Sequence, residues 1–97
     1  MNVGACRISL RLPGAASLKD KRQIVKSITQ RVRNKYNVSV AEIDDNDRWQ
    51  IASLGICVVS NSGRHANEVL SKVVRFIEES RPDLEVLDYG VEVMHPL

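Results

Sequence analysis

The order in which two hydrophobic periodicities follow one another most constrains the fold of this chain. Residues 3–12 alternate between apolar and polar side chains, which is the pattern of a strand with one buried face. Apolar residues recur every three or four positions in residues 17–34 and again between Gly63 and Pro82, and this spacing predicts two helices. Residues 36–43, 49–59 and 84–94 read as three further strands.

The resulting order, strand-helix-strand-strand-helix-strand, is that of the split βαβ arrangement. It predicts an α+β, ferredoxin-like two-layer sandwich, in which two helices cover one face of a four-stranded antiparallel sheet. Right-handed crossovers would give the strand order 4-1-3-2. The chain has 97 residues, and we expect them to form a single domain over residues 1–97.

Side-chain complementarity predicts how the first and last strands pair. Placing Arg7 opposite Glu92 and Arg11 opposite Asp88 joins opposite charges on one face of the sheet. The same register places Leu12 opposite Leu87 on the face covered by the helices. We therefore predict that both arginines are neutralised within the sheet.

The central hairpin predicts an exposed apolar patch. Pairing its strands through the polar turn at residues 44–48 brings Ile43 beside Trp49 and Ala41 beside Ile51 on the open face of the sheet. Exposed apolar groups of this kind often mark a surface that contacts another protein, and the commonest such contact is that of a homodimer. Ile43, Trp49 and Ile51 are therefore the predicted protein interface.

Positive charge is concentrated in the first part of the chain. Residues 1–40 hold nine basic side chains and one acidic one, whereas residues 41–97 hold five basic and eleven acidic ones, so the net charge of +2 hides an asymmetry. Seven of these basic residues lie on the first predicted helix: Lys19, Lys21, Arg22, Lys26, Arg31, Arg33 and Lys35.

Helical geometry gathers part of this charge into a ridge. At 100° per residue, Lys19, Arg22, Lys26 and Arg33 fall within about 60° of one another, beside the apolar stripe. A cationic ridge is typical of a surface that binds the phosphate backbone or an acidic partner, and we predict that all seven basic residues of the helix take part in this binding. The alternative is a solvated surface whose charge the acidic part of the chain balances.

The sequence offers little support for a metal, cofactor or catalytic site. Cys6, Cys57, His65 and His95 lack the spacing of metal ligands or of a nucleophilic triad, and the acidic turn at residues 44–47 lacks the other ligands of an EF-hand. We predict no metal, no cofactor and no catalytic residue. The chain has neither a long apolar run nor a signal-peptide pattern at its start, which predicts a cytoplasmic protein that does not associate with membranes.

Several uncommon strings, in order along the chain, resemble the YlxP-like family of small bacterial proteins. They are residues 17–22, 25–27, 31–34, 36–42, 49–52, 54–55 and 58–60, followed by the helix at 73–78. The resemblance implies a domain of unknown function with a ferredoxin-like fold and no established catalytic residues. Genes of that family commonly lie beside those for a translation initiation factor and ribosome-binding factor A. The resemblance therefore implies a role near ribosome assembly or translation, with ribosomal RNA or a ribosomal subunit as the expected partner.

Three hypotheses follow. The first is a non-enzymatic accessory factor that binds RNA or the ribosome through the basic helix. The second is a homodimeric protein-interaction module without RNA binding. The third is an enzyme like the acylphosphatases, which share this size and fold and bind phosphate in the loop after the first strand. Here residues 12–16 replace their glycine-rich loop and its arginine, which disfavours this hypothesis.

Overall fold

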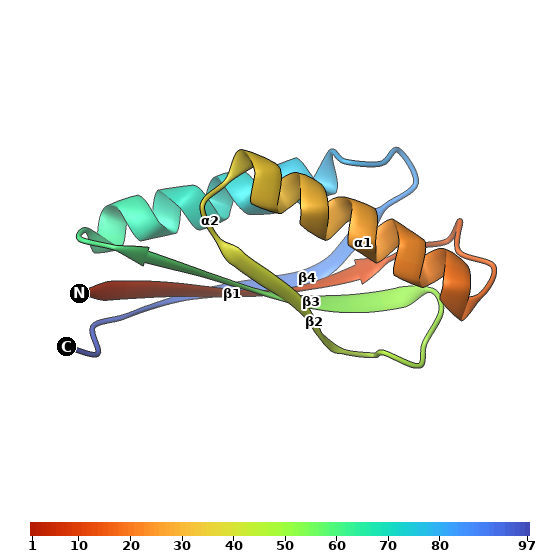
Figure 1. Cartoon of the computed structure of the whole chain (residues 1–97), viewed down its shortest axis with the longest axis horizontal. Coiled ribbons are helices and arrows are strands. Elements are labelled where there is room, and N and C mark those ends of the chain that lie inside the picture. The colour runs from red at the N-terminus through yellow and green to blue at the C-terminus, as the bar shows by residue number, and fades with distance from the viewer.

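The computed structural model describes all residues, 1–97, and has two layers. Its elements are β1 (Asn2–Arg11), α1 (Leu18–Lys35), β2 (Ser39–Asp44), β3 (Ile51–Ser60), α2 (Gly63–Glu78) and β4 (Glu85–Met94). The strands form one antiparallel sheet in the order β2-β3-β1-β4, and both helices lie on the same face of it (Figure 1). The predicted ferredoxin-like fold and strand order are therefore confirmed.

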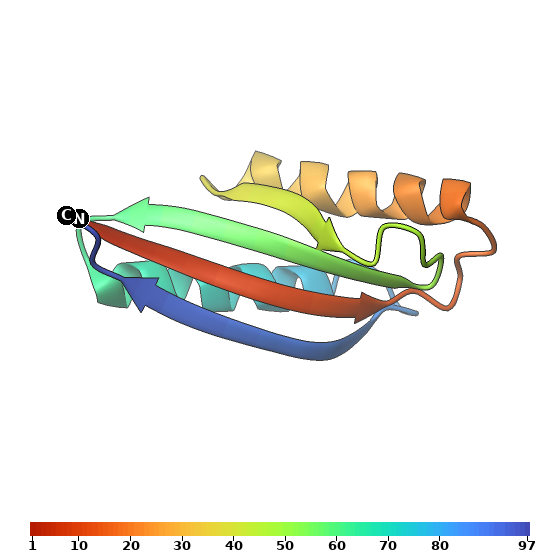
Figure 2. The same ribbon diagram turned by 90° about the horizontal axis from the view of Figure 1, so that it is seen from below.

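The helices divide the sheet between them. α1 lies along the β2 edge, whereas α2 packs behind β1 and β4 (Figure 2). Nineteen buried apolar residues between the two layers form one core, to which β1 contributes Cys6, Ile8 and Leu10. The other face of the sheet has no covering layer, and we call it the open face. The two chain ends meet at one end of the molecule, where the Met1 ammonium donates to the Leu97 carbonyl at 2.9 Å.

The first and last strands pair antiparallel as predicted, but the predicted register is wrong. Arg7 lies opposite Gly90 rather than Glu92, a shift of two residues. An irregularity after Ser9 then brings Arg11 opposite Glu85 instead of Asp88. Neither arginine has the acidic partner that we expected: Arg7 pairs with Asp44 at 2.7 Å, and Arg11 makes no ion pair.

The hairpin register is also wrong, by four residues. Ala41 lies opposite Gly55 rather than Ile51, and β2 begins at Ser39 rather than Tyr36. A bulge between Glu42 and Asp44 leaves Ile43 without a directly opposite partner. Shifts of two and four residues keep side chains on their predicted faces, so the hydrophobic alternation is satisfied there by the observed registers as well. At the irregularity in β4 the shift becomes three residues, and Leu87 leaves the helix-covered face.

Candidate nucleic-acid interface

The start of α1 is a capped helix end. The Ser17 side chain accepts from the Asp20 N–H at 3.1 Å, and the Asp20 carboxylate accepts from the Ala16 N–H at 3.1 Å. These two amides therefore already have partners. A carboxylate also lies beside the preceding loop, because a Cβ at Gly14 would be only 2.5 Å from Asp83 Oδ2. This arrangement does not favour a phosphate in the loop after β1.

Lys21, one of the seven basic residues predicted to bind phosphate, is not at the surface. Its side chain is 1% exposed, its Nζ lies 2.9 Å from Oε2 of Glu42, and it also donates to the carbonyl of Asp45. Glu42 Oε2 is buried and has no other polar partner. The charge of Lys21 thus lies inside the protein, between α1 and the end of β2, and it cannot contact a phosphate at the surface.

The six remaining basic residues of α1 are exposed, but they lie on two sides of the helix. Arg31 and Lys35 face α2: the Arg31 guanidinium is 3.5 Å from the Ser80 carbonyl, and the Lys35 ammonium lies 4.9 Å from the centre of the Phe76 ring. The other four lie on the side of α1 away from α2. We call this set the basic flank: Lys19, Arg22, Lys26 and Arg33.

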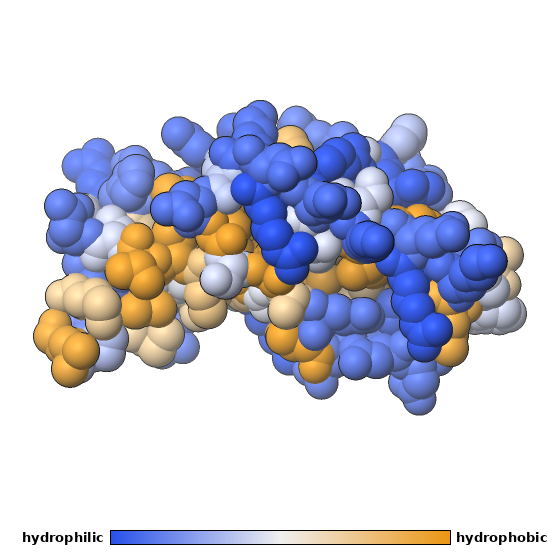
Figure 3. Space-filling model, viewed as in Figure 1, coloured by the Kyte–Doolittle hydropathy of each residue, from blue (hydrophilic) through white to orange (hydrophobic).

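The basic flank has no acidic partner in the chain. The five ion pairs of the structure join Arg7 to Asp44, Lys21 to Glu42, Arg48 to Asp45, Arg64 to Glu68 and Arg81 to Asp83. Glu42 and Asp44 of β2, and Asp45 directly after it, thus pair with cations outside the flank. The charge of the flank is left for solvent or a partner, and Figure 3 shows the helix layer as mainly hydrophilic.

The predicted interface of Ile43, Trp49 and Ile51 is not one patch. All three are at least partly exposed, but the bulge places Ile43 against Gly55, where a Cβ would lie 2.9 Å from Ile43 Cγ2. Ile51 is four residues along β3 from Gly55, a distance of about 13 Å. Trp49 precedes β3 and lies near Ile51, so only these two residues share a surface.

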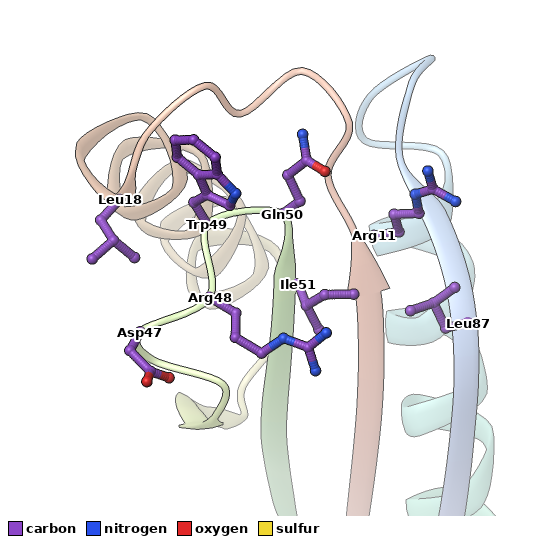
Figure 4. A pocket seen from close by; sticks show the side chains of 8 residues that line it. All are labelled: Arg11, Leu18, Asp47, Arg48, Trp49, Gln50, Ile51 and Leu87. Carbon is purple, nitrogen blue, oxygen red and sulfur yellow. The ribbon is translucent and has the colours of Figure 1, made fainter.

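That surface is a groove of about 640 Å³ at the end of the sheet opposite the chain termini. Three parts of the chain line it: the first residue of α1, the loop before β3, and the ends of the strands. The lining residues are Arg11, Leu18, Asp47, Arg48, Trp49, Gln50, Ile51 and Leu87 (Figure 4). Leu87 lines the groove rather than facing Leu12 in the core, and the altered β1–β4 register accounts for this difference. Sequence reasoning named Trp49 and Ile51 but missed Arg11 and Leu87.

Asp45 fixes the start of the loop that carries Trp49. Its φ of 63° is in the left-handed region, which Asp tolerates better than most residues. Its carboxylate accepts from the Ser53 hydroxyl at 2.8 Å and lies 3.7 Å from Arg48, while its carbonyl accepts from Lys21. One residue thereby joins α1, β3 and the loop.

No group of three or more His, Cys, Asp or Glu side chains is placed to hold a metal ion. Neither helix combines the length and the apolar character that a membrane-spanning segment needs.

Comparisons with known proteins agree with the fold. Residues 3–91 match the family described as "Protein of unknown function (DUF503)". The uncharacterized protein YlxP of Bacillus subtilis (strain 168) is 46% identical over 71 residues, which cover 73% of this chain and 76% of that protein. A de novo designed protein with a ferredoxin fold, solved by NMR, aligns with a TM-score of 0.56 at 16% identity. The alignment covers 97% of this chain and 84% of the designed chain, and the likeness concerns the fold alone.

Proposed function

Because the chain belongs to the DUF503 family, whose function is unknown, its membership assigns no activity, and we propose that it is a non-enzymatic RNA-binding accessory factor of the ribosome. In this proposal the basic flank of α1 contacts the phosphate backbone. Binding of this kind depends on salt and has little sequence preference, because each neutralised phosphate releases counterions.

The observation that carries the proposal is the set of four exposed cations without an acidic partner. On α2, by contrast, Arg64 has Glu68 one turn away, at 3.4 Å. Exposed pairs of that kind reduce the field that a polyanion would experience. The flank lacks them, so no carboxylate at ion-pair distance reduces its field on the side of α1 away from α2. The free cysteines Cys6 and Cys57 fit a reducing compartment, which supports our proposal of a cytoplasmic location.

The test is an anisotropy titration of small-subunit ribosomal RNA across salt concentrations. Replacing Lys19, Arg22 and Lys26 with Gln should weaken binding and lower the slope of log K against log salt by about two to three. Arg33 is kept because its guanidinium donates to the Val40 carbonyl at 2.7 Å and so supports the packing of α1 on β2.

The matched control removes the same charge elsewhere. Arg31, Lys72 and Arg75 are exposed helix residues outside the basic flank, and replacing all three with Gln should leave most of the affinity and the slope. Equal losses in the two triple variants would show that net charge, rather than the flank, attracts RNA. An unchanged titration for the flank variant would refute the proposed site.

A homodimeric interaction module is the second candidate, and one observation favours it. β4 is an edge strand of ten residues, with Leu87 and Tyr89 exposed at 46% and 55%. Long unprotected edges of this kind can pair with another strand. Sedimentation of the free protein and of a Tyr89→Lys variant tests whether β4 forms a dimer interface. A dimer that this substitution dissociates would support the second candidate.

A further inference from the structure

The groove around Trp49 combines an exposed aromatic ring with arginines that lack strong partners. Trp49 is 52% exposed, and the one aromatic pair of the chain joins Tyr36 and Phe76 instead. Arg11 makes no ion pair, and Arg48, with 63% of its side chain exposed, is 3.7 Å from its acidic neighbour. That distance is longer than a charge-assisted hydrogen bond. The ring and both guanidinium groups are therefore available to a ligand.

The groove has an apolar floor and a net positive rim. Leu18, Ile51 and Leu87 supply the apolar surface, and Figure 4 shows Arg48 extending across Ile51 toward Leu87. Asp47 is the single acid among the lining residues, against two arginines. A flat apolar ring that carries negative charge at one side would match both features, because aromatic rings stack and guanidinium groups pair with phosphate. The volume of about 640 Å³ lies within the range of small-ligand sites.

The groove also continues into the basic flank. Leu18, which lines the groove, is four residues before Arg22, and Arg22 is four residues before Lys26. Residues four apart lie above one another on the same side of a helix. A phosphate chain that follows the flank toward the start of α1 would therefore reach the groove, and the next nucleotide would lie beside Trp49.

We propose that this groove binds an unpaired nucleobase, which stacks on Trp49 while Arg11 and Arg48 pair with phosphates of the same strand. This inference rests on the proposed RNA binding by the basic flank and adds a preference for single-stranded nucleotides over duplex. A duplex can meet the flank with its phosphates, but its stacked bases cannot enter the groove without being unstacked.

Trp49 is the single tryptophan of the chain, so its fluorescence reports on the groove directly. The protein is titrated with two RNA probes. One is a hairpin-free single strand of about twelve nucleotides, a length within the usual range of single-strand sites, and the other is a duplex with the same number of phosphates. The single strand should change the emission of Trp49 and bind more tightly. The duplex should bind in a manner that depends on the flank and leave the emission unchanged.

Two variants complete the test. Trp49→Ala should weaken binding of the single strand by roughly 5- to 150-fold, the range expected for one lost stacking contact, and leave duplex binding unchanged. Arg11→Gln retains the reporter ring; it should lower the salt slope for the single strand by about 0.7 and leave that for the duplex unchanged. Thermal unfolding of both variants establishes that they are folded.

The outcomes separate the two proposals. Both probes could bind through the flank and yet give the same change in Trp49 emission and the same loss of affinity in Trp49→Ala. The groove is then not a base site, and the proposed RNA binding stands. If neither probe binds, both proposals are wrong. If Trp49→Ala dissociates a dimer and leaves single-strand binding intact, the groove is a protein contact and the inference is overturned.

Discussion

The ammonium nitrogen of Lys21 lies 2.9 Å from Oε2 of Glu42, and only 1% of the lysine side chain is exposed. One of the seven basic residues of the first helix is therefore a partner in a structural ion pair rather than a surface charge. Removing one partner of a buried pair leaves the other charge without compensation, which is far more costly than losing a surface pair.

Replacing Lys21 with Met should lower the free energy of unfolding by about 3 kcal/mol, because Glu42 then keeps a buried carboxylate without a partner. Urea unfolding measures the loss, and Lys26→Met, at an exposed position of the same helix, should change stability by less than about 0.5 kcal/mol. Adding Glu42→Leu to Lys21→Met should restore part of the stability. Salt slopes for RNA should not change in Lys21→Met, since this residue is not at the surface.

The contact between Gly55 and Ile43 makes a second prediction. Gly55→Ala would put a Cβ 2.9 Å from Ile43 Cγ2, so the variant should lose about 1–2 kcal/mol of unfolding free energy. Gly90 is the control, since it lies opposite Arg7 on the other side of β1 and a Cβ there meets nothing within 4 Å. Gly90→Ala should therefore be neutral or stabilising by about 0.4–1 kcal/mol. A double variant with Ile43→Ala should relieve the loss at Gly55, and a purely additive result would contradict the proposed clash.

The two cysteines should differ in their reaction with alkylating agents. Cys6 is 4% exposed in the core, and burial raises the pKa of its thiol to about 11, whereas Cys57 is exposed on the open face. The reactive species is the thiolate, which Cys6 does not form at neutral pH. Iodoacetamide at neutral pH should add one label to the native protein, at Cys57, and two labels in urea. Two labels acquired at equal rates by the native protein would show that Cys6 is accessible.

The same thiol makes stability depend on pH in the alkaline range. In the unfolded chain Cys6 loses its proton near the ordinary pKa of 9.0, whereas the folded protein keeps it until about 11. The unfolded state therefore binds fewer protons between these values, and stability should fall as the pH rises from 9 to 11, by up to about 2–3 kcal/mol. Cys6→Ala removes this contribution, so the difference in unfolding free energy between the two proteins should shrink across that interval.

The order of elements could be predicted from the sequence because each periodicity is sustained over a whole element. The helix cap at Ser17 was predictable for the same kind of reason, since Asp20 follows at the spacing of a reciprocal cap. The registers were not, because alternation with a period of two distinguishes the faces of a strand but not a shift of two or four residues. The irregularities near Ile43 and Leu87 left no clear mark in the sequence.

Lys21, in contrast, did leave a signal. Lys21, Val25, Ile28 and Val32 follow one another at spacings of four, three and four, so the lysine occupies a position of the buried stripe. The acid that neutralises it comes from β2, and its proximity depends on tertiary packing. The groove could not be predicted for the same reason. Arg11, Trp49 and Leu87 come from three distant parts of the chain and meet only through the observed register.

Asp45 has a consequence for the motion of the loop that it begins. A segment tied to a helix and to a central strand through one residue should not swing independently of either, and we expect it to be ordered before any ligand arrives. Amide hydrogen exchange at Arg48, whose N–H donates to the Asp45 carbonyl at 3.0 Å, should therefore follow that of the sheet rather than that of a free turn. Encounter with a partner would resemble the docking of two rigid bodies, with an association rate governed by diffusion and charge rather than by loop closure.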